Sequence, residues 1–345
     1  MHSDPETRAA ETSAALSLSV IIPVCNALPW LEACLQSILG QTLHSFELIL
    51  VDDGSTDGSG ACCDRAAAAD ARVRVLHQCN AGVSAARNHG LAASHGTAVI
   101  FLDADDTVEP EMLQTMLERL ETDRTDAAIC GYVNERLGSA AAVVPPDGVL
   151  VTADLLPRCF DTHAFVPIAC NKMFRKAVLQ RPDGTWLSFP EGITNGEDFA
   201  WTTQALCACS RVSCIARPFY HYYIRQESAT DGIRTRLDEK ALTELQAYEL
   251  VLEACRPVSQ EALHLATLRY LNRLLIKLKA ADLQENAAVQ ALICPLLQRA
   301  AQAFYPQNSR ERLTLLKIRL ILLLKRLHAG RSLLLFAENW LSLSK

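Results

Sequence analysis

Short apolar runs alternate with helix-spaced segments along the first part of the chain. The runs are rich in β-branched and other apolar residues, and comprise Leu18–Val24, Phe46–Val51, Val73–Leu76 and Ala98–Leu102. Segments with helical spacing lie between them, at Pro29–Leu39, Gly60–Asp70 and Gly82–Ser94. Near-continuous apolar runs are typical of strands buried on both faces, as in a parallel sheet. The alternation predicts the order β-α-β-α-β-α-β and an α/β fold with helices on both faces of the sheet.

The last third of the chain has a different pattern. Two further strands are expected at Ala127–Val133 and Arg211–Ala216, but the composition changes near Asp231 and only helical periodicity follows. The expected helices are Leu242–Cys255, Ser259–Ala280, Asn286–Phe304 and Ser309–His328. The pattern therefore predicts a disordered tail at 1–17, an α/β domain at 18–230 and an all-α helical region at 231–345.

Acidic residues gather directly after two of the expected strands. Asp103, Asp105 and Asp106 follow the strand at Ala98–Leu102, and the turn-rich segment Asp52–Asp57 follows an earlier one. Ligands bind parallel sheets at the carboxyl ends of the strands, where both acidic segments are expected to lie. Clustered carboxylates repel each other unless a cation is present, and they suit Mg²⁺ or Mn²⁺ shared with a substrate's phosphates. The alternative is a solvated, Asp-rich turn.

Composition narrows the function classes. The chain has 345 residues, 50% hydrophobic and 21% charged, which suits a globular protein with one large domain and a smaller one. Its net charge of −6 argues against bulk nucleic-acid binding. The 13 cysteines are odd in number and the first residues form no apolar signal segment, so we expect free thiols in a reducing cytoplasm.

The last expected helix carries two apolar strips with basic residues between them. One strip holds Leu313, Leu316, Leu320, Leu323, Leu324 and Leu327, and the other holds Leu315, Ile318 and Leu322. A helix that packs against the protein on one side needs only one apolar strip. Two interpretations stay open, namely core packing of a helical lid and a surface helix that rests on anionic lipid at the inner face of the plasma membrane.

Six motifs occur in a fixed order between about Leu18 and Ser228. They are Ser19–Asn26, Val51–Gly58, Asn80–Asn88, Phe101–Asp106, Asn171–Lys172 and Gly196–Asp198. Together these motifs resemble those of the family 2 glycosyltransferases, although that family usually has an aromatic residue where this chain has Cys25. The resemblance implies a GT-A fold, with a Rossmann-like, mostly parallel sheet flanked by helices, and an inverting enzyme that uses a nucleotide sugar.

The resemblance also implies roles for individual residues. The residues expected to bind the nucleotide are Pro23, Asn26, Asp53, Arg87, Asp103 and Asp105. Asp53 resembles the acid that reads the uracil edge, and Asp103 the acid that faces the ribose. Asp105 is expected to hold a divalent cation, Mn²⁺ or Mg²⁺, on the diphosphate. Asp198 resembles the general base.

The geometry of inversion limits which residue can be that base. The acceptor hydroxyl must attack from the face opposite the leaving diphosphate, so its base must come from a different loop than the metal ligand. Asp198 meets this condition, and the positive end of the helix that it begins is expected to keep its carboxylate ionised and weakly basic. Glu197 is the second candidate, and simple capping of the helix by Asp198 is the structural alternative.

The expected function is transfer of a sugar from a UDP-sugar to a saccharide or lipid-linked acceptor, in the synthesis of surface polysaccharide or glycolipid. A dinucleotide-dependent oxidoreductase is disfavoured because no G-x-G-x-x-G motif follows the first strand. The remaining alternative is a non-catalytic protein that binds nucleotide sugars or serves as a scaffold on the same fold.

Overall fold

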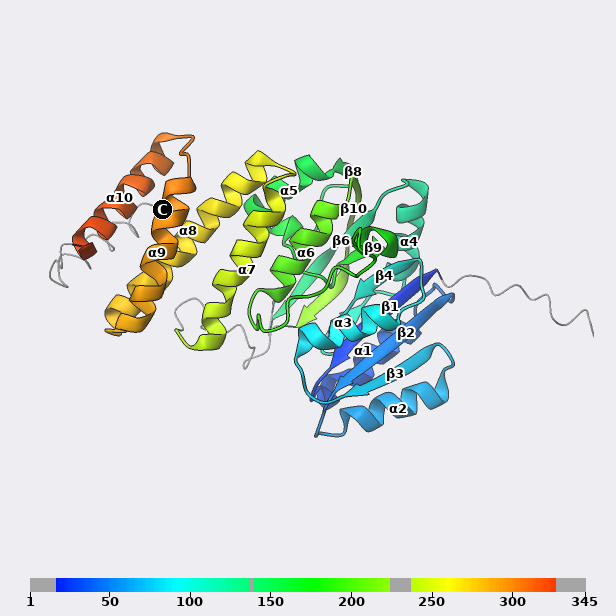
Figure 1. Ribbon diagram of the computed structural model, residues 1–345. Coiled ribbons are helices and arrows are strands. Elements are labelled where there is room, and N and C mark those ends of the chain that lie inside the picture. The colour runs from blue at the N-terminus through cyan, green and yellow to red at the C-terminus, as the bar shows by residue number, and fades with distance from the viewer. Residues whose placement is uncertain (1–16, 137–138, 224–236, 327–345) are drawn as a thin grey trace, which may run out of the picture.

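The computed structural model describes residues 17–136, 139–223 and 237–326. Within them, a mixed sheet of ten strands forms an α/β body, and a stack of helices extends from one side of it (Figure 1). The strands are β1 (Leu18–Val24), β2 (Phe46–Asp53), β3 (Val73–Gln78), β4 (Ala98–Phe101), β5 (Thr107–Val108), β6 (Ala127–Arg136), β7 (Ser139–Val143), β8 (Gly148–Val151), β9 (Lys172–Arg175) and β10 (Arg211–Tyr223). The predicted fold class, an α/β sheet flanked by helices and followed by a helical region, is confirmed.

The first four strands form the parallel part of the sheet. β1 lies between β2 and β4, and β3 lies outside β2. Every residue of β2 and β4 is buried, as expected of strands that are covered by helices on both faces. Because the four strands run in the same direction, the segments that follow their carboxyl ends meet at one edge of the sheet.

The other part of the sheet mixes both directions. β9 lies between β4 and β6 and is antiparallel to each, whereas β10 runs parallel to β6. β5 and β8 pair antiparallel with β10, and β7 pairs antiparallel with β6. The hydrophobic pattern did not predict β5, β7, β8 or β9. Each of these short strands contains a polar residue or glycine, so none forms a continuous apolar run like that of β4.

Helices cover both faces of the sheet. Those on one face are α1 (Leu28–Leu39), α2 (Ser59–Ala69) and α4 (Met112–Thr122). Those on the other are α3 (Val83–Ala93), α5 (Thr152–Asp161) and α6 (Glu197–Ala208). Gly90 lets α3 approach β1 closely, since a Cβ atom on this residue would lie 2.4 Å from Ile21 Cγ2. The start of α3 is thereby held beside the carboxyl edge of the parallel strands.

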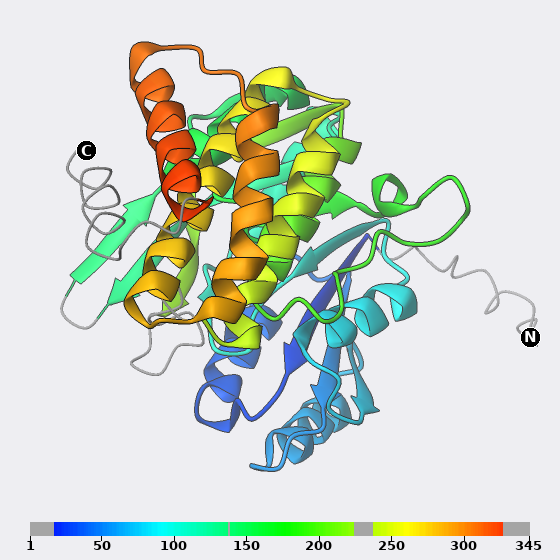
Figure 2. The same cartoon turned by 60° about the vertical axis from the view of Figure 1, so that its left-hand side comes forward.

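Four helices form the described part of the C-terminal region, residues 237–326, each farther from the sheet than the one before (Figures 1 and 2). They are α7 (Glu239–Cys255), α8 (Gln260–Leu283), α9 (Ala287–Ala303) and α10 (Ser309–Arg326). The side chains of Asp238, Ser259 and Asn286 cap the first three helices by accepting backbone N–H groups. α7 and the start of α8 share the core under α5 and α6, so the helical region is packed directly onto the α/β body. The predicted tail at 1–17, apart from residue 17, and the predicted boundary at 230/231 lie outside the described residues.

α10 buries one of its two apolar strips. Leu315 and Ile318 lie in the core of the helical region, as the core-packing interpretation requires. Leu313, Leu316, Leu320 and Leu323 belong to the other strip and are each at least 39% exposed among the described residues. Leu327 and His328, at the end of the expected helix, lie outside the described residues. No helix in the described part of the chain is long and apolar enough to cross a membrane.

Candidate functional site

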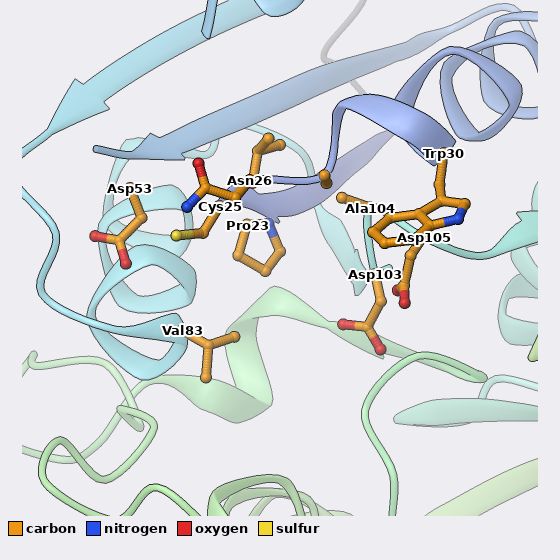
Figure 3. Close-up of a pocket in the computed structure, with 11 residues that line it drawn as sticks. Pro23, Cys25, Asn26, Trp30, Asp53, Val83, Asp103, Ala104 and Asp105 are labelled. Atoms are coloured by element: carbon orange, nitrogen blue, oxygen red, sulfur yellow. The ribbon is translucent and has the colours of Figure 1, made fainter. Parts of the chain in front are cut away.

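Two cavities lie at the edge of the sheet where β1, β2 and β4 end. The strand-end cavity has a volume of about 420 Å³, and the residues that line it include Pro23, Asn26, Trp30, Asp53, Asp103 and Asp105. Figure 3 shows Asp53 at one end of this cavity and Asp103 and Asp105 at the other. The helix-side cavity, of about 620 Å³, is lined by residues of β6, the segment 166–170, α6, β10, α7 and α8. Asp103 lines both cavities, so they meet at the end of β4.

Asp53 holds the start of α3 against the end of β2. One of its carboxylate oxygens accepts the Ala81 N–H and the Gln78 side-chain N–H, both at 2.8 Å, and the other accepts the Gly82 N–H at 2.9 Å. The sharp turn after Asp53 depends on Gly54, whose φ is +69°. Asp53 therefore has a structural task as well as a place in the wall of the strand-end cavity.

The segment after β1 is tied to the segment after β2. Asn26 adopts a left-handed φ of 51°, its backbone N–H donates to Ser55 Oγ, and its side-chain oxygen accepts the Thr56 N–H at 2.8 Å. The neighbouring Cys25 accepts a hydrogen bond from the Asn80 amide at 3.2 Å. These contacts fix the main chain around one end of the strand-end cavity, and Pro23 lies in the same wall.

The three acids that follow β4 do not converge. Asp103 and Asp105 line the strand-end cavity, whereas Asp106 is 2% exposed and turns into the protein. Its carboxylate accepts the Tyr220 hydroxyl and the Tyr223 backbone N–H. Burial raises the pKa of Asp106 to about 7, and the charge of Asp103 adds to this shift. The sequence pattern suggested one cluster of three acids, but Asp106 instead ties the end of β4 to β10.

The remaining pair of acids fits a divalent cation that is brought by a diphosphate. Among the described residues, no three His, Cys, Asp or Glu side chains lie close enough together to form a complete metal site. Mg²⁺ and Mn²⁺ on phosphorylated substrates need only one or two protein carboxylates, because phosphate oxygens and water complete the coordination. Asp105 supplies such a carboxylate in the cavity wall, next to Asp103.

Arg87 joins the ends of β4 and α6. Its guanidinium donates to Asp103 at 2.9 Å and to Asp198 at 2.5 Å, and it lies 3.6 Å from Glu197. The side chain is only 5% exposed and packs over the ring of Phe189. Burial opposes the charged form, but the attraction of the surrounding carboxylates outweighs burial and raises the pKa of Arg87. Arg87 lines the helix-side cavity, and its expected contact with the nucleotide stays a prediction.

Asp198 lies in the first turn of α6, at the point where the helix-side cavity reaches Asp103. The helix begins at Gly196, whose φ is +88°, and no side chain caps it. Asp198 instead directs its carboxylate to Arg87, so the capping interpretation is wrong. Burial raises the pKa of Asp198 to about 6, although Arg87 acts against this shift. The pKa of this group is therefore raised and not lowered as expected for a carboxylate at a helix start, because burial and the charges of Asp103 and Glu197 outweigh the attraction of Arg87.

A buried lysine shapes one wall of the helix-side cavity. Lys172 is fully buried and donates to the carbonyl oxygens of Val166 and Ile168 and to the Asn171 side-chain oxygen, at 2.7–2.9 Å. Asn171 in turn donates to the Cys130 carbonyl oxygen on β6. Burial lowers the pKa of Lys172. The Asn171–Lys172 pair was part of the sequence resemblance, but its role as a support for the segment 166–170 needs the tertiary structure.

Several other residues that line the two cavities had no role predicted from the sequence. They are Trp30 in the strand-end cavity, and Tyr132, Tyr222, Glu244, Tyr248, Arg269 and Arg273 in the helix-side cavity. They come from separate elements without a shared motif. For those on α7 and α8, the available signal was the presence of charged residues within otherwise apolar helices, and this does not distinguish a cavity from a surface.

The topology of the sheet, with acids after β2 and β4 at the carboxyl ends of its parallel strands, is that of the GT-A fold. Residues 19–181 match the family model described as glycosyl transferase family 2. The chain is also 32% identical over 237 residues to the uncharacterized glycosyltransferase EpsJ of Bacillus subtilis. The aligned residues cover 67% of this chain and 68% of that protein. The chain belongs to glycosyltransferase family 2 and is a glycosyltransferase.

Solved structures with the same fold carry nucleotide sugars. The S. aureus TarS fragment 1–349 in complex with UDP-GlcNAc has a TM-score of 0.69 and 20% identity, over 94% of this chain and 90% of that one. The mannosyltransferase PcManGT of Pyrobaculum calidifontis, in complex with GDP-Man and Mn²⁺, has a TM-score of 0.54 and 19% identity, over 89% and 86% of the two chains. At these identities the likeness establishes the fold.

Proposed function

We propose that this glycosyltransferase inverts the anomeric centre of a UDP-sugar as it transfers the sugar to a hydroxyl group. The strand-end cavity holds the nucleotide diphosphate, and the helix-side cavity holds the acceptor. The observation that carries the proposal is the meeting of the two cavities at Asp103, where Arg87 links this residue to Asp198. The transferred sugar occupies that junction.

The reaction is a displacement at the anomeric carbon. A bond forms between the acceptor oxygen and that carbon, while the bond from the carbon to the diphosphate oxygen breaks and leaves UDP. Asp198 accepts the proton of the attacking hydroxyl, and a pKa of about 6 leaves it mostly ionised at neutral pH yet more basic than an ordinary aspartate. Arg87 fixes the orientation of Asp198, and Glu197 remains the second candidate for the base.

The donor pocket combines a metal ligand and a base-recognition group. Asp105, beside Asp103, would hold a divalent cation, which when bound stabilises the negative charge that develops on the leaving diphosphate. Asp53 accepts a single N–H on one carboxylate oxygen, so that oxygen has room to accept the N3 hydrogen of uracil as well. Pro23, Asn26 and the ribose-facing Asp103 complete the nucleotide contacts.

The acceptor is a saccharide or a lipid-linked saccharide, in the synthesis of surface polysaccharide or glycolipid. The exposed leucines of α10 support peripheral contact with a membrane, because Leu313, Leu316, Leu320 and Leu323 form an apolar strip at the protein surface. Such contact would bring the enzyme to the inner face of the plasma membrane, where lipid-linked acceptors are accessible.

A thermal-shift panel of UDP, CDP, GDP and ADP, with and without Mn²⁺, tests the proposal on the purified chain. Ligands that bind the folded state raise its Tm, so UDP with Mn²⁺ is expected to give the largest increase. The same protein should release UDP from UDP-sugars when Mn²⁺ is present. A panel in which no nucleotide raises the Tm, together with absence of UDP release, would contradict the proposal.

A further inference from the structure

One wall of the helix-side cavity is formed by α7 and α8, which are the last of the lining elements in the order of the chain. Arg269 and Arg273 are four residues apart on α8, so their side chains leave the same face of the helix, and both line the cavity. Glu244 of α7 lines it beside them. This wall belongs to the helical region and shares no residue with the strand-end cavity.

Positive charge exceeds negative charge at this wall. Glu244 is shared between Arg273 Nε, at 3.3 Å, and the fully buried Lys277, whose Nζ lies 3.1 Å away. Among the described residues, Arg269 forms no ion pair and Arg273 Nη1 is buried without a hydrogen-bond partner. Two arginines therefore line this wall, and Glu244 is the single carboxylate among the lining residues of α7 and α8. Buried positive charge without a partner is costly unless a ligand supplies one.

The opposite end of the cavity has the reverse imbalance. There, Asp103, Glu197 and Asp198 surround the single cation of Arg87. The cavity thus has an acidic end, where the proposed chemistry takes place, and a basic end on α8. A neutral sugar would use hydrogen bonds at both ends but would leave the positive charge of the basic end uncompensated.

We propose that the acceptor carries a phosphate group, and that Arg269 and Arg273 bind this group while the reacting hydroxyl lies at Asp198. The inference rests on the proposed function, because it assigns the helix-side cavity to the acceptor. Guanidinium groups bind phosphate through paired, charge-assisted hydrogen bonds. Two arginines in a wall with a single glutamate, which also pairs with Lys277, suit a phosphate better than a carboxylate, because a carboxylate brings only one charge.

The test compares maltose 1-phosphate with maltose by calorimetry, using the full chain saturated with UDP and Mn²⁺. Wild type is expected to bind the phosphorylated probe about tenfold or more tightly than maltose, the value of one or two charge-assisted hydrogen bonds. Arg269→Gln and Arg273→Gln should each reduce this preference to within about threefold. Arg269→Gln is the cleaner variant because it breaks no ion pair within the described residues.

Arg299→Gln is the matched control. Arg299 lies on α9, is 69% exposed and pairs only at the surface with Glu249, so the phosphate preference should be unchanged. Equal binding of the two probes by wild type would overturn the inference, as would a preference that survives both Arg269→Gln and Arg273→Gln. UDP affinity, measured on each variant first, checks that the protein is folded. If wild type does not bind UDP, this result contradicts the proposed function and not the further inference alone.

A second arm identifies the source of the phosphate. Phosphatidylcholine vesicles with and without phosphatidylglycerol are sedimented with wild type and with Arg269→Gln. If wild type pellets with vesicles that contain phosphatidylglycerol and Arg269→Gln does not, the inference is supported and the phosphate belongs to a lipid headgroup. If maltose 1-phosphate binds wild type but not Arg269→Gln, and neither protein pellets with the vesicles, the inference is supported and the phosphate belongs to a soluble saccharide.

Discussion

The strand-end and helix-side cavities share Asp103 but are built in different ways. The strand-end cavity is bounded by short segments after β1, β2 and β4, which are linked by hydrogen bonds to the main chain, such as those of Asp53 and Asn26. The helix-side cavity is bounded by Arg87 and Asp103 and by residues of many separate segments farther along the chain, from β6 to α8. The first is therefore fixed by the sheet, whereas the second depends on how the helical region packs. Under the proposed function, changes in α7 and α8 would therefore alter acceptor binding without disturbing the donor pocket.

Asp198→Asn tests this division most strongly. Loss of the general base is expected to lower kcat by about 10²–10⁴-fold, while the affinity for UDP stays within a few-fold of wild type. The side chain faces the helix-side cavity, and Asn keeps its shape and a hydrogen-bonding oxygen for Arg87. Steady-state kinetics with UDP release as the readout, together with calorimetry of UDP, measures both quantities.

Glu197→Gln provides the comparison for that experiment. Glu197 lies 3.6 Å from Arg87 and is expected to affect kcat much less than Asp198. If Asp198→Asn retains kcat within about threefold of wild type and Glu197→Gln does not, then Glu197 is the base.

Asp105→Asn addresses the strand-end cavity. The variant is expected to lose about tenfold or more of its affinity for UDP in the presence of Mn²⁺, and to bind UDP like wild type in EDTA, because only the metal-dependent contribution disappears. Asp183→Asn removes an exposed carboxylate elsewhere and should bind UDP like wild type in both conditions. Calorimetry that shows the same Mn²⁺-dependent gain in Asp105→Asn as in wild type would rule out this assignment.

The pH dependence separates catalysis from stability at Asp198. The base must be ionised, so kcat/KM should fall about tenfold for each pH unit below the pKa of about 6. Because that pKa is raised on folding, the protonated group favours the folded state, and this contribution is lost as the pH rises from about 4 to about 6. The Tm of Asp198→Asn should therefore increase relative to wild type over this range. A wild-type pH profile that is flat between pH 5 and 7, that is, within about one unit of this pKa, would contradict Asp198 as the base.

Uridine selectivity tests the other end of the strand-end cavity. A carboxylate at Asp53 accepts the N3 hydrogen of uracil, whereas cytosine has an acceptor at that position, so UDP should compete about tenfold or more better than CDP. Asp53→Asn is expected to reduce that ratio and also to lower the Tm, because its carboxylate holds the Ala81 and Gly82 N–H groups. Equal competition by UDP and CDP in wild type would exclude this role.

The smallest expected effect concerns α10, which is remote from both cavities. Leu316→Glu places a charge in the exposed apolar strip and should reduce sedimentation with anionic vesicles by a few-fold, while UDP binding stays unchanged. Leu292→Glu makes the same change at a 48% exposed position on α9 and serves as the control. If both variants sediment like wild type, the exposed strip has another function.

Local sequence was sufficient to predict the parallel part of the fold and most of the strand-end cavity. Buried strands give continuous apolar runs, and the acids and glycines of their connecting segments lie within a few residues of each strand end, as Asp53 and Asp105 do. The burial of Asp106 away from the cavity was not predictable from its neighbours in the sequence, because its partners Tyr220 and Tyr223 lie more than a hundred residues away.

The basicity of Asp198 and the lining of the helix-side cavity depend on tertiary packing. The sequence places Asp198 at a helix start, which alone would lower its pKa, but the packing around it desolvates the carboxyl group and raises the pKa. Arg269 and Arg273 lie in a helix whose periodicity is readable, yet which of its faces meets α7 and the cavity follows only from the assembled structure.

Lys172 surrounded by oxygen atoms resembles an ammonium ion in a crown ether. All three of its N–H groups are used by neutral oxygens, two of them main-chain carbonyls. Such a cage accepts a tetrahedral ammonium but not a planar guanidinium or a methyl group, so arginine and methionine would both leave carbonyl groups without partners. The segment 166–170 is consequently held in place by Lys172 without help from a ligand. Under the proposed function, substitutions on the α7–α8 side of the cavity would change the acceptor more readily than substitutions on this side.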